Sequence, residues 1–598
     1  YLSTGISGAR HIENEGIINS DGASNIVYSN IGYTPDWSKT WYQNNNNNGP
    51  LNRNKYGDGS AAQNLMRSVI KLGTDGGQVN LYGDENVGLF FGSKMGGADP
   101  KSWEAAHRIE EFDNANYLRK ASFIGIYQGE IELHAKIGEK TSSTGSDQVN
   151  GVGNIYESAP NGKKYDPKFV EGAVGIYSES GQREGIDPIR DLGVPTNASG
   201  KDYAHIGSLS NDKIHNLEIG KVNVRFGSKS KNGFMFISKL GTVMDIAKSK
   251  TTTDYISGLS TEITDGMNGE NTTEEDASTG TTIAYAEGTW DQGKHKLGST
   301  ATEKANNDNR ATGSTARKLQ GLGSAINIFT PKVTLASKQG IAYMGDNKGI
   351  INVGTTANNV KTTAVNHRSI IGFARDEGTV TINGNVEAKD AKAQTNKWQN
   401  IAGLAVKTKT GAKGGTVTIN GNVDVHGMAG FADGTGSVVN LKGTGNTVST
   451  GTDGALAAKN GGVVNFGGGT ITHKNNGTVA GKNDHESSVP FYADNTSKVN
   501  FEGNGSNPSR TTIEMADGVL MSEEASKYNG LNDGKAKYNG MKNVTVKLVG
   551  DNVILKTTIG KDITWTGASG LVASGKLFDS LLGIDYKWGV LIGGGTII

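Results

Sequence analysis

The feature that most constrains this chain is a string of nine residues that occurs twice without change. Gly-Thr-Val-Thr-Ile-Asn-Gly-Asn-Val fills residues 378–386 and again residues 415–423. Its first half alternates polar and apolar residues, the period of two that places alternate side chains on one face of a β-strand. Two identical copies of a strand and its turn predict that the copies occupy equivalent positions in a stack. This is the arrangement of repeat proteins, in which a single unit cannot bury its apolar face and neighbouring units form the core together.

Looser copies of this strand recur along the chain and share an apolar, asparagine, apolar alternation. They lie at 350–354, 438–441, 462–467 and 498–503, with earlier copies at 79–81 and 222–224. A second short apolar segment precedes four of the units across a polar turn, at 372–374, 430–432, 456–458 and 491–493. The repeated asparagine has two interpretations: an amide ladder between stacked rungs, or a turn residue that tolerates positive φ.

Strand, turn, strand therefore repeats as one unit. Glycine accounts for 87 of the 598 residues, roughly twice the usual share of about 7%, which indicates many turns. These observations predict an all-β chain folded as a right-handed parallel β-helix, a solenoid with long loop and short helical insertions. A β-sandwich is the weaker alternative because it does not need its strand motif to repeat in the sequence.

The regularity of the repeat predicts two parts. Residues 341–598 form the more regular shaft, and residues 1–340 form a distal part with long insertions. One insertion, 100–112, is expected to be helical because Asp99 can cap it and apolar residues follow at three-residue steps. Another, 248–319, is expected to be a flexible loop because it is polar and has few large apolar side chains.

Several classes of function are disfavoured. The chain has 60 basic and 60 acidic residues, which leaves no excess charge for nucleic acid. It has no cysteine for disulfides or thiolate metal sites, and neither a catalytic triad nor a complete zinc or dinucleotide motif occurs. Asp376, Asp433 and Asp494 are expected to be solvated turn residues rather than catalytic carboxylates. We therefore expect no enzyme activity, no cofactor and no metal site.

One cluster of aromatic and charged residues is a candidate partner-binding site near the distal end. Two of the seven tryptophans fall within it. Such residues can anchor a protein partner or stack on sugar rings, whereas the alternative is a loop pinned to the shaft by its aromatic side chains. The candidate residues are Tyr33, Asp36, Trp37, Lys39, Trp41 and Tyr42.

Two of the units carry a family resemblance. Residues 462–466 and 497–501, each preceded by an apolar strand ending in alanine and a polar turn, resemble the rungs of type V (classical) autotransporter passengers. The nine-residue copies, the Lys- and Asn-rich composition and the long insertions resemble the very large fusobacterial outer-membrane adhesins. The resemblance implies a rod on the surface of a Gram-negative cell, with its membrane anchor, a C-terminal barrel, outside this fragment.

The resemblance also implies partners. They are host glycans, of galactose or N-acetylgalactosamine type, or host receptor ectodomains such as immunoglobulin-like immune receptors, and other bacteria. The leading hypothesis is accordingly an adhesin that presents loops on a β-helical rod. Each copy of the protein would bind weakly, and many copies on one cell would bind together. A self-associating passenger for autoaggregation or biofilm is the first alternative, and a polysaccharide-degrading β-helix enzyme is the second.

Overall fold

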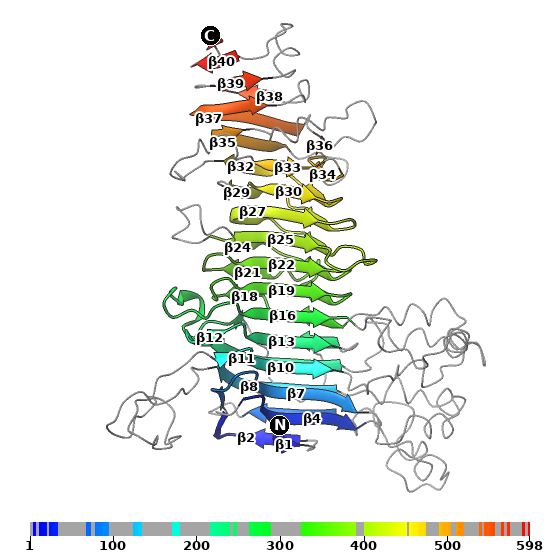
Figure 1. Ribbon diagram of the computed structural model, residues 1–598. Helices are drawn as coiled ribbons and strands as arrows, with labels where there is room; N and C mark the ends of the chain where they lie inside the picture. The colour runs from blue at the N-terminus through cyan, green and yellow to red at the C-terminus, as the bar shows by residue number, and fades with distance from the viewer. Residues whose placement is uncertain are drawn as a thin grey trace, which may run out of the picture. The chain divides into compact units, whose positions relative to one another are not determined.

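The chain forms two compact units in a computed structural model (Figure 1). Unit 1 contains residues 1–267, 275–330 and 347–351, and unit 2 contains residues 268–274, 331–346 and 352–598. The residues that the structure describes are 4–7, 11–20, 23–33, 67–72, 78–94, 124–133, 170–179, 216–239, 243–247, 262–288, 324–389, 400–450, 454–473, 490–494, 496–503, 510–519, 538–540, 543–556, 564–566, 571–574, 589–592 and 596–597.

Unit 1 contains two ladders of parallel strands. The first joins, in order, β1 (Thr4–Ser7), β4 (Ile26–Tyr33), β7 (Val87–Lys94), β10 (Val174–Glu179), β13 (Phe234–Lys239) and β16 (Thr282–Glu287). The second joins β2 (His11–Asn14), β5 (Arg67–Leu72), β8 (Ile124–Leu133), β11 (Asn216–Phe226), β14 (Val243–Ile246) and β17 (Ala325–Ile328). Shorter strands complete the unit: β3 (Ile17–Ser20), β6 (Gln78–Leu81), β9 (Val170–Glu171), β12 (Ser230–Lys231) and β15 (Glu262–Thr264).

Unit 2 has three parallel ladders, which we name faces A, B and C. Face A joins β19 (Ile341–Asp346), β22 (Ile370–Arg375), β25 (Asn400–Val406), β27 (Val423–Asp433), β30 (Leu456–Lys459) and β33 (Phe491–Ala493). Face B joins β23 (Thr379–Ile382), β26 (Thr416–Ile419), β28 (Val438–Leu441), β31 (Val463–Phe466), β34 (Lys498–Asn500) and β36 (Tyr538–Asn539). Face C joins β18 (Lys332–Leu335), β21 (Lys361–Ala364), β24 (Val386–Ala388), the first part of β27, β29 (Asn446–Thr450), β32 (Gly469–His473), β35 (Thr511–Val519) and β37 (Val544–Lys556).

The remaining elements extend these ladders or lie outside them. Strand β20 (Ile350–Val353) is the neighbour of β23 in the sheet of face B, and β38 (Thr564–Thr566) and β39 (Leu571–Ser574) pair with β37. The short 3-10 helix η3 (Gly269–Asn271) and the strands β40 (Gly589–Ile592) and β41 (Thr596–Ile597) complete the described elements. In unit 2 the chain visits faces C, A and B in turn, so each coil contributes a strand to each ladder. Strand β27 runs through both C and A because Gly427, with φ 133°, allows the chain to bend without leaving the sheet.

The two unchanged nine-residue copies are neighbours in the stack. Val380 pairs with Val417 and Ile382 pairs with Ile419, with β23 and β26 parallel and in direct register. Because these strands belong to successive coils of three parallel ladders, the expected parallel β-helix is confirmed and the sandwich alternative is wrong.

The core of unit 2 is built unequally from its faces. Face B supplies large apolar side chains, all at most 1% exposed: Val380, Ile382, Val417, Ile419, Val439, Leu441, Val464, Phe466, Val499 and Phe501. In its central strands β22, β25 and β27, face A supplies small inward residues instead, namely Gly372, Ala374, Gly403, Ala405, Gly430 and Ala432. The same inward row is continued by large buried residues in β19, β30 and β33, namely Tyr343, Leu456 and Phe491. A Cβ atom on Gly403 would lie only 2.8 Å from Cγ1 of Val439. The valines therefore fill the space that face A leaves open.

The repeated asparagine forms a ladder, which decides between the two interpretations above. On the outside of face B, Nδ2 of Asn465 donates to Oδ1 of Asn440 at 2.7 Å, and Nδ2 of Asn500 donates to Asn465 at 2.6 Å. Asn539 continues the series by donating to Asn500 at 2.7 Å, and Asn440 donates to the hydroxyl of Thr418 at 3.2 Å. Each amide thus links its own coil to the next.

One sequence prediction is wrong and two others are untested. The segment 248–319 was expected to be a flexible loop, but residues 262–288 within it contain β15, η3 and β16. Ile263, Ile283 and Ala284 there are buried, because these short strands carry enough apolar residues to join the core. The expected helix at 100–112 lies outside the described residues. The division into residues 1–340 and 341–598 stays a prediction.

Candidate binding face

The aromatic cluster predicted from the sequence lies almost entirely outside the described residues. Tyr33 is the last residue of β4, and its backbone pairs with Lys94 of β7. The other candidates, Asp36, Trp37, Lys39, Trp41 and Tyr42, are not among the residues that the structure describes. Their role in binding stays a prediction.

Face A of unit 2 carries a row of apolar side chains on its outer surface. One residue from each successive strand contributes, each paired in register with the next. Phe373, Leu404, Phe431 and Tyr492 are partly exposed, whereas Met344 and Ala457 are 9% and 7% exposed. We call this row the outer apolar column: Met344, Phe373, Leu404, Phe431, Ala457 and Tyr492.

The small inward residues of face A explain why the large ones point outward. In β22 the inward positions are taken by Gly372 and Ala374, and Phe373 between them faces away from the core. The same alternation places Phe431 outward between Gly430 and Ala432. At Gly372, Gly403 and Gly430 the valines of face B already fill the interior, so a large inward side chain would not fit at these three positions.

A second apolar row runs beside the first. Ile341 pairs with Ile370, Ile370 with Ile401, and the chain then places Met428 beside Ile401. The three isoleucines are partly exposed, and Met428 is 9% exposed. Figure 1 shows the strands that carry both rows side by side, with their arrows pointing the same way. Two adjoining apolar rows on an outer sheet face are the kind of surface that marks a binding site in soluble proteins.

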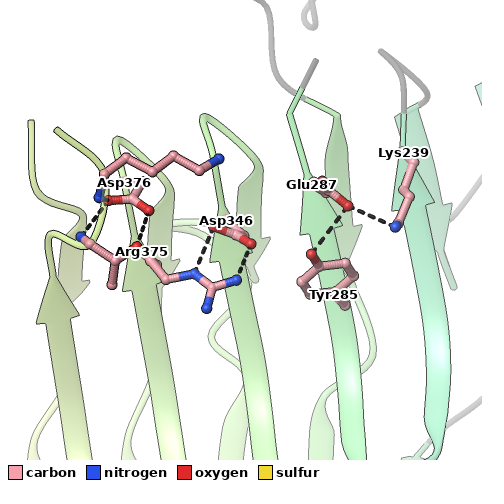
Figure 2. Close-up of polar contacts among 8 residues, drawn as sticks. Lys239, Tyr285, Glu287, Asp346, Arg375 and Asp376 are labelled. Atoms are coloured by element: carbon pink, nitrogen blue, oxygen red, sulfur yellow. Dashed lines mark hydrogen bonds and ion pairs between the residues drawn. The ribbon is translucent and has the colours of Figure 1, made fainter. Parts of the chain in front are cut away.

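A third row, at the ends of the same strands, is mostly charged. We call it the charged border, and in register order it consists of Asp346, Arg375, Val406, Asp433 and Lys459. Figure 2 shows the guanidinium of Arg375 directed at the carboxylate of Asp346, where Nε donates to Oδ1 at 2.9 Å and Nη2 contacts Oδ2. The side chain of Asp346 is 6% exposed and that of Arg375 is 35% exposed, so the guanidinium covers the carboxylate and faces outward.

The border and the outer apolar column contact one another. The Nζ atom of Lys459 lies 5.9 Å from the ring centroid of Phe431 and 5.8 Å from that of Tyr492. A cation above two aromatic rings is held by their negative faces. The side-chain amide of Asn460 donates to Oδ1 of Asp433 at 2.7 Å and so holds the carboxylate that precedes Lys459 in the border. Face A therefore presents charged side chains, held in place by these contacts, next to an apolar surface.

One of the three turn carboxylates, Asp376, is not the solvated turn residue expected from the sequence. Asp376 is 1% exposed; its Oδ1 accepts the backbone N–H groups of Thr408, at 2.6 Å, and Lys409, at 3.0 Å, from the next coil. Burial by itself raises the pKa of Asp376, but these hydrogen bonds and that of the Thr408 hydroxyl outweigh it and lower the pKa below its usual value. The carboxylate is thus a structural link between coils (Figure 2).

Asp494 has a similar role at the equivalent turn. It accepts the backbone N–H of Asn460 at 2.6 Å and both the N–H and the hydroxyl of Thr496 at 2.9 Å. Burial opposes ionisation, but these bonds and that of Ser497 lower the pKa of Asp494. Its charge is directed into the turn, not along the charged border.

Unit 1 carries a related pattern on the ladder that contains β10 and β16. The rings of Phe90 and Tyr177 stack with centroids 5.4 Å apart. Lys239 pairs with Glu287 at 2.7 Å and lies 5.6 Å from the ring of Tyr285, whose hydroxyl donates to Glu287 at 3.2 Å (Figure 2). Outward aromatic rings next to paired charges thus occur in both units.

Sequence reasoning recorded the apolar segments of face A but did not identify them as a surface. The signal that it missed is the order of sizes: glycine and alanine flank a single large residue, and a charged residue follows. Among the described residues, no group of three His, Cys, Asp or Glu side chains is placed to hold a metal ion. No helix in the described part of the chain is both long and apolar enough to cross a membrane.

Comparisons with known protein families, with curated proteins and with solved structures find no match for this chain. The fold and the binding face therefore carry the functional argument.

Proposed function

We propose that this chain is an adhesin, an extracellular binding protein of a bacterial surface, and that face A of unit 2 is one of its binding surfaces. The observation that carries the proposal is the outer apolar column, because it places partly exposed aromatic and aliphatic side chains on neighbouring coils beside ordered charge. Buried aromatic anchors surrounded by charged groups are typical of protein interfaces.

Face A favours a protein partner over a glycan. Aromatic rings alone would suit the apolar faces of sugars, but the adjoining row of Ile341, Ile370 and Ile401 offers aliphatic surface that hydroxyl-rich glycans do not match. Receptor ectodomains of host cells and surface proteins of other bacteria are partners of this kind. The β-helix contributes by repeating the same surface on successive coils, so that weak contacts act together.

The test is binding of beads coated with the full chain to host cells and to other bacteria. The double variant Phe373→Ser/Phe431→Ser removes the two phenylalanines of the outer apolar column. We expect binding to fall at least tenfold, since hot-spot side chains contribute about 2 kcal/mol or more each. Undiminished binding by this variant would refute the role of face A.

Two matched variants separate the possible binding surfaces. Thr381→Ser/Thr418→Ser alters outward positions of face B on neighbouring coils and should bind like the parent chain. Trp37→Ala/Trp41→Ala/Tyr42→Ala tests the aromatic cluster predicted from the sequence. Loss of binding in this triple variant alone, with normal unfolding, would move the site to the distal cluster.

A further inference from the structure

We propose that face A of unit 2 pairs with face A of a second copy of this chain, the two copies running antiparallel about a two-fold axis at Val406. The inference rests on the proposed function, since it names a partner for the same face. The axis lies along the strand direction. Each row of one copy then faces the same row of the other in reversed order, which is a self-complementary, closed contact.

The order of charges in the border favours this pairing. In register order the border reads negative, positive, neutral, negative, positive, from Asp346 to Lys459. Reversal about Val406 places Arg375 opposite Asp433 of the second copy, and Asp433 opposite its Arg375. At the two ends Lys459 lies opposite the position of Asp346, whose carboxylate is covered by Arg375 and contributes little charge. The two contacts nearest the axis thus both join opposite signs.

The same order disfavours neighbouring registers. If the second copy slips by one coil in one direction, Arg375 faces the neutral Val406 and both opposite-sign contacts are lost; in the other direction, Arg375 comes to face Lys459. Like charges directly opposite one another are destabilising. Since successive coils are about 4.8 Å apart, a slip of one coil is the smallest that keeps the rows aligned. The charged border therefore selects one register.

The outer apolar column matches in this register as well. Reversal about Leu404 places Phe373 opposite Phe431 of the second copy, and Leu404 opposite itself. The larger Met344 faces the smaller Ala457. Aromatic side chains therefore meet at the two symmetric positions nearest the axis, where pairs of rings add attraction beyond the area that they bury.

The size of the face makes this a weak association. Five strands spaced by about 4.8 Å, each about 20 Å long, give roughly 500 Å² per copy, or about 1,000 Å² in total. Stable protein–protein interfaces bury about 1,200–2,000 Å². A single pair should therefore dissociate readily, whereas many copies on two facing surfaces would hold together through multivalency. Antiparallel pairing suits rods that extend from opposite surfaces.

The first experiment is sedimentation velocity of the full chain over a range of concentrations, with variants at the two positions nearest Val406. Arg375→Asp and Asp433→Arg each bring like charges together in the antiparallel pair, so each alone should weaken self-association about tenfold or more. An equimolar mixture of the two variants restores both opposite-sign contacts and should associate within about threefold of the parent. Thr418→Asp, an outward position on face B, is the matched charge control.

The second experiment uses the absence of cysteine from the chain. Met344→Cys and Ala457→Cys are prepared separately and treated with a short bis-maleimide cross-linker. The proposed pairing brings residue 344 opposite residue 457, so the mixture should form covalent dimers much faster than either variant alone. Thr418→Cys provides the rate for random collision.

The outcomes separate the inference from the proposed function. Recovery of association in the mixed charge variants, with selective 344–457 cross-linking, supports the antiparallel pair. A parent chain that stays monomeric at the highest concentration, or cross-linking no faster than that of Thr418→Cys, overturns it. In that case binding to host cells by the bead assay would leave the proposed adhesin function intact.

Discussion

Replacement of Phe501 by alanine tests how the interior of unit 2 is built. Phe501 is 0% exposed, and its ring centroid lies 5.3 Å from that of Phe491 and 6.3 Å from that of Phe466, both edge to face. Phe→Ala changes in protein cores cost about 3–5 kcal/mol. Because two aromatic contacts are lost together with the buried area, we expect the upper part of this range, about 4–5 kcal/mol.

The assay for this prediction is native-state hydrogen exchange of the strands beside Phe501. Stability in a solenoid is largely a sum over neighbouring repeats, so the effect should be concentrated in β31 and β34. A loss of about 4 kcal/mol raises exchange through local opening about a thousandfold, since about 1.4 kcal/mol is a factor of ten.

The matched control for Phe501 is Tyr492→Ala. Tyr492 lies in β33 of the same coil but is partly exposed in the outer apolar column. Its replacement should cost about 1 kcal/mol or less, as is usual for surface positions. Equal effects of the two replacements on exchange in β31 and β34 would refute the assignment of inner and outer positions.

Three further predictions concern the contacts between coils. Gly403→Ala should destabilise unit 2 by about 1–3 kcal/mol because its Cβ would lie 2.8 Å from Val439, and Val439→Ala in the same chain should restore part of the loss in urea unfolding. Asn465→Ala should cost about 0.5–1.5 kcal/mol and raise exchange in both β28 and β34, because it interrupts the amide ladder in both directions; a change confined to β31 would contradict the ladder. The folded state lowers the pKa of Asp376, so the stability that this carboxylate contributes is present above its unfolded pKa of about 3.9 and is lost as the pH falls through the folded pKa. Asp376→Ala should therefore destabilise the chain by about 1–3 kcal/mol at pH 7, and the difference from the parent should shrink below about pH 4; a difference that is constant with pH would contradict an ionised carboxylate.

The repeat in the sequence was enough to predict the coils, because identical residues such as Val380 and Val417 must meet in a parallel stack. It also predicted the inward side chains of face B, where apolar residues alternate with polar ones. The alternation fails on face A, since Gly372, Phe373 and Ala374 are all apolar. Hydropathy cannot then show which of them faces the core, and only the volume already taken by Val417 and Val380 decides it.

The charged border illustrates a second limit of sequence reasoning. Asp346 and Arg375 belong to different coils, and Lys459 is separated from both by long stretches of chain. Their order along one edge depends on the length of every intervening coil, which the irregular insertions obscure. The role of Asp376 was missed for a similar reason, because its hydrogen-bond donors, Thr408 and Lys409, come from the next coil.

The orientation of the residues in β22 tests the central claim most directly, because the binding face exists only if the large residues of face A point outward. The chain has no cysteine, so single cysteines at 371, 373, 374 and 375 can be compared for their reaction with a water-soluble maleimide in the folded chain. We predict fast reaction at 373 and 375, slow reaction at 371 and 374, and protection of 373 when a partner is bound. Fast reaction at 374 with slow reaction at 373 would contradict the account.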